Sequence, residues 1–249
     1  MSLSDFAAFA ETLADAARGV TLGAVDRTAE NKNAGGAFDP VTEADREAER
    51  VIRALIEQAF PDHGIAGEEY GVKDGAGRHV WSLDPIDGTR AFICGLPSWT
   101  TLIALLDEGV PVVGLIDVPV LDERYLGFAG AAGLKASDCR SLREARACST
   151  DPYLFAGAEA EGFARLRRTA RLTRYGYDAY AYARLAAGSV DLVAESGLKP
   201  HDYNALIPVV RAAGGVIGNW RGEDDFSDGQ VLAAATRDLF EEAVGVLAA

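Results

Sequence analysis

Cysteine and histidine are scarce in this chain of 249 residues, which has three of each. The cysteines, at positions 94, 139 and 148, are odd in number and form no CxxC pair. Neither a disulfide scaffold nor a thiolate zinc site is therefore expected, and a reducing compartment fits better. His201 has no histidine partner at metal-ligand spacing, so a loop histidine is its simpler interpretation.

Positive charge is also limited, with 24 Lys and Arg against 38 Asp and Glu and a formal net charge of −14. Nucleic acid and anionic membrane surfaces reward clustered basic side chains, so neither is expected as a partner. Taken alone, the same balance argues against phosphorylated substrates. Whether phosphorylated substrates are in fact excluded depends on whether the residues that would bind them also hold cations.

Long apolar runs are missing as well. No segment approaches the roughly 18 consecutive apolar residues of a membrane helix, so no membrane span is expected. Residues 1–18 carry three acids and no basic region before an apolar run, unlike a signal peptide. With 49% hydrophobic residues, the composition is that of a globular protein with a sizeable core. We therefore predict a soluble, cytoplasmic protein.

The apolar pattern predicts two successive arrangements of helices and strands. The first has helices over residues 3–18 and from Thr42 to Pro61, then strands at 79–83, 100–106, 110–118 and 125–128. In the second, helices near 159–168, 178–187, 203–213 and 236–247 alternate with strands near 152–156, 171–175, 190–194 and 230–235. Such alternation is typical of a mixed or parallel sheet covered by helices.

Residues 84–89, Asp-Pro-Ile-Asp-Gly-Thr, form the most informative segment. A predicted strand ends there in two carboxylates, Asp84 and Asp87, within a Pro/Gly turn. Acids held this close repel each other unless a cation lies between them, and hard divalent cations take oxygen ligands. The N–H groups of Gly88 and Thr89 would form an anion seat if a helix begins there. An Asx-type turn is the alternative and is favoured for the Asp-x-x-Asp pattern alone.

Other acids stand where predicted elements begin or end. Glu68 and Glu69 follow a short apolar strand, and Asp45 lies in the first turn of a helix capped by Thr42. Asp202 precedes a predicted helix as a plausible N-cap. Each of these acids has a simple explanation by itself, as a surface acid or a cap. Their occurrence together has none.

Residues 31–38, rich in Asn and Gly, are predicted to form a loop or hairpin tip. One hypothesis makes this segment a mobile flap from which Lys32 approaches a phosphate. An ordinary surface loop is the alternative.

Together these segments resemble the inositol monophosphatase-like, Mg²⁺-dependent phosphatases, in the family's order and over roughly residues 4–247. The matching segments are Asp-Pro-Val-Thr-Glu-Ala-Asp at 39–45, Gly-Glu-Glu at 67–69, Trp-Ser-Leu-Asp-Pro-Ile-Asp-Gly-Thr at 81–89, and His-Asp at 201–202 ahead of Ala-Ala-Gly-Gly at 212–215. The resemblance implies an α/β fold, a layered αβαβα sandwich of the inositol monophosphatase/fructose bisphosphatase type. By the same resemblance, the fold is expected to divide into an N-terminal α+β part, 1–135, and a C-terminal α/β part, 136–249, and the protein is expected to form a homodimer.

The resemblance also implies the metal ligands. Two or three Mg²⁺ ions would be held by Glu68, Asp84, Asp87 and Asp202, with the backbone carbonyl of Ile86 as a further ligand. Cations held by these four acids would make the site attractive to a small phosphorylated substrate despite the net charge of −14.

The remaining roles concern water, phosphate and substrate. Asp45 and Thr89 resemble the pair that orients and activates the attacking water, and the N–H groups of Gly88 and Thr89 would bind the phosphate. Asp178 and Glu195 match positions on the substrate-facing side.

The branch within the family is indicated by residues 87–93, Asp-Gly-Thr-Arg-Ala-Phe-Ile, and 197–200, Gly-Leu-Lys-Pro. These look like the histidinol-phosphate phosphatases, whereas inositol monophosphatases usually read Asp-Gly-Thr-Thr-Asn-Phe. His201 departs from the Tyr common in that branch, while Asp178 favours it because an acid can pair with a cationic substrate. We predict hydrolysis of L-histidinol phosphate, as in histidine biosynthesis. An inositol-1-monophosphatase or broad sugar-phosphate phosphatase is the alternative, and an inert metal-binding regulatory protein is the alternative from another class.

Overall fold

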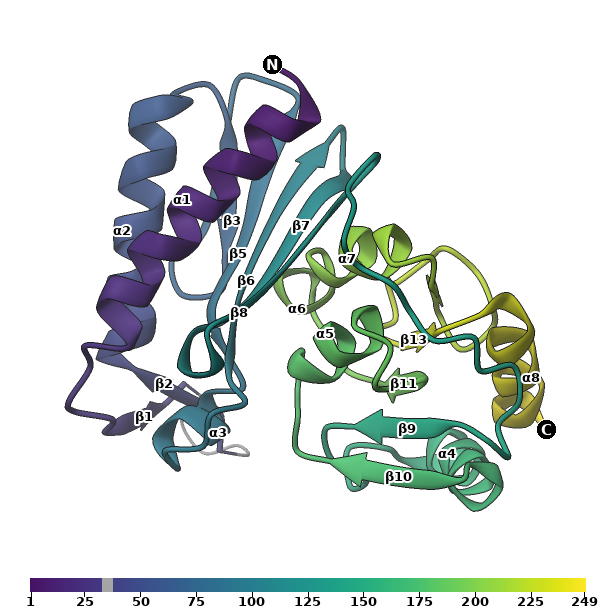
Figure 1. Ribbon diagram of the computed structural model, residues 1–249. Coiled ribbons are helices and arrows are strands. Elements are labelled where there is room, and N and C mark those ends of the chain that lie inside the picture. Colours follow the sequence, from purple (N-terminus) through teal and green to yellow (C-terminus); the bar gives the residue numbers. More distant parts are fainter. Residues whose placement is uncertain (33–37) are drawn as a thin grey trace.

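The computed structural model describes residues 1–32 and 38–249 (Figure 1). Its described part contains a six-stranded sheet, a five-stranded sheet and a short antiparallel ribbon of β1 (Ala29–Asn31) and β2 (Pro40–Thr42). The predicted layered arrangement of helices and sheets is confirmed. The tip of the predicted loop, residues 33–37, lies outside the described residues.

The six-stranded sheet has the order β4-β3-β5-β6-β7-β8 and is antiparallel except where β3 pairs with β5. Alternate residues of β6 face opposite sides, as the period of a strand requires. Ile103 belongs to the core formed with the first two helices, whereas Leu102 packs toward the C-terminal helices. The strands are β3 (Gly64–Gly67), β4 (Gly71–Lys73), β5 (His79–Asp87), β6 (Thr100–Asp107), β7 (Val110–Val118) and β8 (Glu123–Phe128).

Helices α1 (Leu3–Thr21) and α2 (Glu43–Ala59) cover one face of this sheet, as Figure 1 shows. Leu13 and Ile52 from these helices are fully buried against Trp81 of β5. Both helices were predicted from their apolar stripes, and Thr42 is the N-cap of α2 as expected. Burial of this face brings the first turn of α2 close to the end of β5.

The five-stranded sheet has the order β10-β9-β11-β13-β12, with β10, β9 and β11 parallel and β13 antiparallel to both of its neighbours. It is therefore a mixed sheet, as predicted. Its strands are β9 (Arg146–Ser149), β10 (Leu172–Tyr175), β11 (Leu192–Glu195), β12 (Val216–Gly218) and β13 (Val231–Ala234).

Helices cover both faces of the second sheet and complete five layers. Val193 of β11 faces α5 (Tyr180–Ala186) and α7 (Leu206–Ala212), which lie between the sheets, with the short α6 (Pro200–Tyr203) preceding α7. Leu192 faces α4 (Gly157–Thr169) and α8 (Arg237–Ala248) on the outside. The order of layers is thus helix, sheet, helix, sheet, helix. The proposed division at residues 135 and 136 falls in the connection between β8 and β9.

Two predicted elements in the second half are wrong. Residues 152–156 form no strand, because Tyr153 is 91% exposed and only Phe155 of the apolar run is buried. The strand lies earlier, at β9, whose sequence Arg-Ala-Cys-Ser lacks the usual strand formers. The predicted helix 203–213 is interrupted at residues 204–205, so that α6 and α7 are separate.

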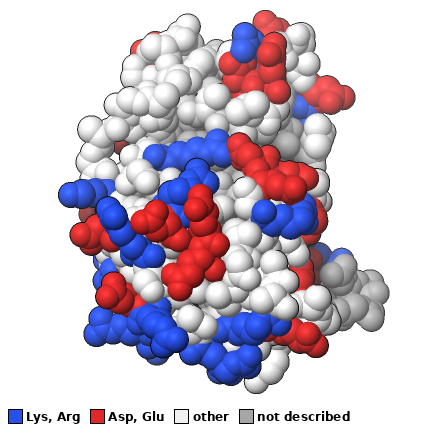
Figure 2. Space-filling view, turned by 90° about the vertical axis from the view of Figure 1, so that its right-hand side faces the viewer, with Lys and Arg blue, Asp and Glu red and all other residues white. Residues whose placement is uncertain are grey.

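The surface carries charges of both signs. On the face shown in Figure 2, acidic and basic side chains are interspersed in small groups. None of the helices within residues 1–32 and 38–249 has the length and apolar character needed to cross a membrane.

Candidate active site

A β-bulge at the end of β5 places two carboxylates beside each other. Asp84 lies opposite Leu102 and Asp87 opposite Thr100, so β5 has one more residue than β6 over this stretch. The bulge is held by Thr101, whose hydroxyl donates to the Pro85 carbonyl at 2.7 Å. Because a bulge changes the direction of side chains, both acids reach the same cluster.

The third member of this cluster comes from the other half of the chain. One carboxylate oxygen from each of Asp84, Asp87 and Asp202 lies within 4.8 Å of the other two. Asp202 is on α6, which is attached to β5 by a hydrogen bond of 3.1 Å from the Asn204 amide to the Ser82 hydroxyl. Of the two interpretations of Asp202, as an N-cap and as a metal ligand, the N-cap is wrong. Lys199 is the N-cap, and its N–H donates to the Asp202 carboxylate at 2.7 Å.

Electrostatics at the cluster favour a bound cation. Burial, and then the charges of Glu68, Asp87 and Asp202, raise the pKa of Asp84 well above its ordinary value. Burial, and then the charges of Asp178 and Asp202, do the same for the pKa of Asp87. The carboxylates of Asp84 and Asp87 are both repelled by Asp202, and every donor of the cluster is an oxygen. This donor set fits a hard divalent cation.

Glu68 lies at the edge of the cluster, directly after β3. Its Oε1 is 2.9 Å from the Lys32 ammonium, which also lies 2.7 Å from Glu69. Burial opposes ionisation of Glu68, but Lys32 and His201 outweigh it and lower its pKa. Burial raises the pKa of Glu69 to about 7. Lys32 thus contacts a predicted metal ligand, and its contact with a phosphate stays a prediction.

Asp45 is fully buried in the first turn of α2. Its Oδ2 accepts hydrogen bonds from the Thr42 N–H at 2.9 Å and the Thr42 hydroxyl at 2.5 Å. Its Oδ1 has no partner among the residues that the structure describes, and burial raises its pKa. An unpartnered buried carboxylate oxygen requires a donor such as a water molecule, and if it binds a proton it becomes a donor that requires an acceptor.

Thr89 begins α3 (Thr89–Ile93) and its hydroxyl donates to the Ile86 carbonyl at 3.1 Å. Within the described part of the chain it makes no hydrogen bond to Asp45, so their cooperation stays a prediction. Gly88, at φ +80°, precedes this helix, and a Cβ there would lie 2.9 Å from Oδ2 of Asp178. Glycine therefore serves both the left-handed turn and the close approach of Asp178.

The two predicted substrate residues share one pocket with the acidic cluster. This pocket, of about 140 Å³, is lined by Asp87, Asp178, Glu195 and Asp202 among others. Glu195 is held by the Thr150 N–H at 2.8 Å and the Thr150 hydroxyl at 2.9 Å. Burial raises the pKa of Glu195 to about 8 and that of Asp178 to about 6. Burial therefore disfavours the ionised form of both acids, and a positive charge beside them would stabilise it.

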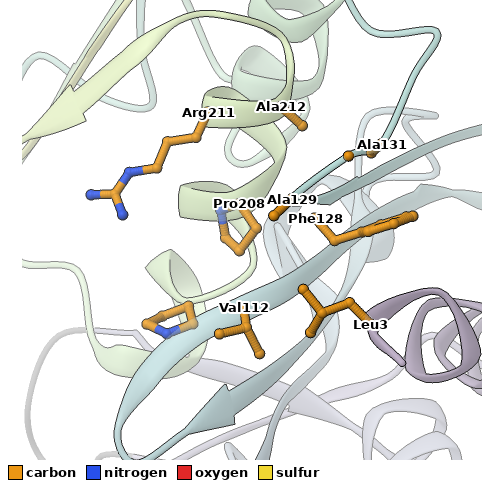
Figure 3. Close-up of a pocket in the computed structure, with 10 residues that line it drawn as sticks. Leu3, Val112, Phe128, Ala129, Ala131, Pro208, Arg211 and Ala212 are labelled. Atoms are coloured by element: carbon orange, nitrogen blue, oxygen red, sulfur yellow. The ribbon is translucent and has the colours of Figure 1, made fainter. Parts of the chain in front are cut away.

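A larger pocket, of about 420 Å³, lies away from this cluster (Figure 3). Leu3, Val112, Phe128 and Pro208 supply apolar walls, and Arg211 is its charged residue. None of the predicted site residues lines it. The chemistry therefore concentrates at the smaller, acidic pocket.

Sequence reasoning missed three residues of this region. Thr150 directly follows β9 and donates hydrogen bonds to Glu195. Because the sequence does not predict β9, no sequence pattern indicates Thr150. Tyr182 lines the small pocket with a buried hydroxyl that has no partner among the described residues. Glu49 is fully buried one helical turn after Asp45, and this i, i+4 spacing could have found it.

The chain is similar to known phosphatases in both sequence and structure. Residues 2–248 match the model of the inositol monophosphatase family. The chain is 44% identical to the chloroplastic bifunctional phosphatase IMPL2 of Arabidopsis thaliana over 207 residues, covering 80% of this chain but 60% of that protein. It is 35% identical to the histidinol-phosphatase of Streptomyces coelicolor over 96% of this chain and 95% of that protein. A solved inositol monophosphatase from Zymomonas mobilis has a TM-score of 0.87 and 36% identity, with both chains fully covered.

Proposed function

The chain belongs to the inositol monophosphatase family, a family of metal-dependent phosphatases, and from this premise we propose that it hydrolyses L-histidinol phosphate to L-histidinol and phosphate with Mg²⁺. The observation that carries the proposed substrate is the pocket in which Asp178 and Glu195 join the acidic cluster. Two carboxylates remain there beyond those assigned to the metal.

These two acids support a substrate with a cationic end, because a positive charge beside them would stabilise their ionised forms, which burial disfavours. Histidinol phosphate carries an amine and an imidazole beside its phosphate, and each can form a charge-assisted hydrogen bond with a carboxylate. Such bonds contribute about 1.5–3 kcal/mol each. An inositol ring offers only neutral hydroxyls to Asp178 and Glu195, and so gains less.

The proposed metal ligands are Glu68, Asp84, Asp87, Asp202 and the Ile86 carbonyl, and they would hold two or three Mg²⁺ ions. When bound, the cations would neutralise phosphate charge and lower the pKa of the attacking water. The mutual repulsion of the carboxylates and their all-oxygen character support this assignment.

The chain's own residues would supply the remaining steps. The unpartnered Oδ1 of Asp45 would accept the proton of the attacking water, with Thr89 orienting that water. The N–H groups of Gly88 and Thr89 would bind phosphate oxygens at the start of α3. Asp178 and Glu195 would hold the leaving group, so that phosphate and leaving group are fixed at opposite ends of the reacting bond.

An inositol-1-monophosphatase is the second candidate, and the similarity to a solved inositol monophosphatase over the full chain favours it. An inert metal-binding protein is a weaker candidate, because every proposed ligand and both proposed catalytic residues are present.

Phosphate release with and without Mg²⁺ tests the proposed activity. We expect purified protein to release phosphate from L-histidinol phosphate, with L-histidinol detected by mass spectrometry, and EDTA to abolish the reaction. Metal binding without phosphate release from histidinol phosphate, inositol 1-phosphate or a sugar phosphate would instead support the inert scaffold.

Two further expectations belong to the same proposal. We propose a homodimer located in the cytoplasm, with no nucleic-acid or membrane partner. Light scattering coupled to size-exclusion chromatography would measure the mass, and twice the chain mass of 26.3 kDa is the expected value.

A further inference from the structure

Glu49 is a carboxylate enclosed by the fold, on the same face of α2 as Asp45. Its side chain is 0% exposed, and Oε1 lies 2.7 Å from Nε of Arg53, one helical turn later. A buried carboxylate requires hydrogen-bond donors for its oxygens, and both oxygens of Glu49 have them. The identity of these donors indicates the role of Glu49.

Two of these partners belong to the turn that carries the metal-site residue Glu68. Oε2 of Glu49 accepts a hydrogen bond from the Glu69 N–H at 2.8 Å, and Oε1 accepts one from the Tyr70 N–H at 3.2 Å. On the other side, the N–H of Glu68 donates to the Leu83 carbonyl of β5 at 3.1 Å. The backbone around the Glu68 side chain is therefore held on two sides. Its own N–H bonds to β5, and the next two N–H groups bond to Glu49 of α2.

Gly67, the last residue of β3, allows this close approach. A Cβ at Gly67 would overlap with the carboxylate of Glu49. The absence of a side chain there lets the acid lie directly against the strand end and reach the two N–H groups beyond it. The Gly-Glu-Glu segment at 67–69 thus packs against and hydrogen-bonds with Glu49 of α2.

We propose that Glu49 is a positioning residue that holds the Glu68 carboxylate in place for the divalent cation. This inference rests on the proposed function, because Glu68 as a metal ligand is part of it. Helix α2 would then serve the site twice, through Asp45 directly and through Glu49 by way of the 68–70 turn. Partners that hold a metal ligand in place typically affect metal affinity about 10–100-fold when they are replaced.

Glu49→Gln is the direct test, with Mg²⁺ alone as the probe in isothermal titration calorimetry. The amide keeps the size of the side chain but replaces one acceptor oxygen by a donor, which faces Arg53 or a backbone N–H. We expect the Kd for Mg²⁺ to rise at least about tenfold. The kcat at saturating Mg²⁺ should largely recover, because Glu49 does not touch the substrate.

Glu47→Gln is the matched control. Glu47 is on the same helix and also pairs with an arginine, Arg50, but its side chain is 39% exposed, and among the described residues no hydrogen bond or ion pair joins it to the 68–70 turn. The Glu47→Gln variant loses the same charge as Glu49→Gln, and we expect its Kd for Mg²⁺ to equal that of the unaltered chain. An equal rise in both variants would show a general charge effect and overturn the proposal.

Gly67→Ala keeps the proposal testable if Glu49→Gln fails to fold. Its methyl group would push the Glu49 carboxylate away from the turn and should also raise the Kd for Mg²⁺. A folded Glu49→Gln or Gly67→Ala variant with an unchanged Kd and only a lower Tm would show that Glu49 is merely structural. If the unaltered chain binds Mg²⁺ but releases no phosphate, only the proposed function fails. If it binds no divalent cation, both fail.

Discussion

The backbone N–H of Ala179 donates a hydrogen bond of 2.8 Å to Oδ2 of Asp87. This contact joins the end of β5 to the start of α5, two elements that lie far apart in the sequence. It places Asp178, the residue before Ala179, at the edge of the acidic cluster, with its backbone in the left-handed region at φ +46°. A predicted metal ligand therefore positions a predicted substrate residue, and a change at either should affect the other.

Asp178→Asn is expected to affect substrates unequally. Asn tolerates the left-handed backbone of this position and keeps the size of the side chain, but it removes the charge. The KM for histidinol phosphate should rise about tenfold, the value of one lost charge-assisted hydrogen bond, while the KM for inositol 1-phosphate should change little. Steady-state kinetics on both substrates measures this, and equal changes would contradict the assignment of Asp178.

Asp84→Asn should make the metal-free protein more stable. Asp84 is buried among three other carboxylates, so a permanently neutral side chain removes repulsion that is otherwise relieved by a cation or by binding a proton. We expect Tm in EDTA to rise by about 2–4 °C, which corresponds to about 1 kcal/mol for a chain of this size. Stabilisation by added Mg²⁺ should shrink in the same variant, because affinity is lost. The exposed Asp74→Asn should change neither value, and a lower Tm for Asp84→Asn in EDTA would contradict this account of the cluster.

Gly88→Ala should lose both stability and substrate affinity. Its φ of +80° costs a non-glycine residue about 1–2 kcal/mol, and the new methyl group would crowd Asp178. Gly214→Ala is the matched control, since Gly214 has φ +81° and nothing within 4 Å of its added Cβ. Chemical denaturation should show similar losses for the two variants, whereas only Gly88→Ala should raise KM. A raised KM in both would assign the effect to backbone strain alone.

His63 makes the stability of the fold sensitive to acid. Burial, and then the neighbouring His79, lower the pKa of His63, and its Nδ1 accepts a hydrogen bond of 3.1 Å from the Trp81 indole. The unfolded chain binds the proton more readily, so this contribution is complete above the ordinary pKa of 6.5 and is lost as pH falls from there through the lowered pKa of the folded state.

His63→Phe tests this contribution, because it keeps a ring stacked on Phe60 but cannot titrate. Between about pH 8 and about pH 5, Tm should fall more steeply for the unaltered chain than for the variant. Parallel curves would exclude His63 as the cause.

Much of the N-terminal half could be predicted because its signals are local. The apolar stripe of α2, the cap at Thr42 and the hairpin of β6 and β7 each depend on residues close in sequence. β9 escaped prediction because its burial, rather than strand propensity, decides its structure: Ala147 and Cys148 are covered by layers on both sides.

The acids of the site could be identified from sequence, but not their arrangement. That Asp202 meets Asp84 and Asp87 depends on α6 lying against β5, which no local pattern reveals. The same holds for Thr150 beneath Glu195 and for Glu49 beneath the 68–70 turn, since both contacts join distant elements. Motifs thus indicated which residues matter, and the packing of layers determines what each of them touches.

The ratio of kcat/KM for L-histidinol phosphate to that for inositol 1-phosphate, at saturating Mg²⁺, tests the proposed function most directly. With Asp178 and Glu195 paired to the cationic end of the substrate, the ratio should be at least about ten. A ratio of one or less would contradict histidinol phosphate as the substrate and assign the site to a neutral, hydroxyl-bearing phosphate ester.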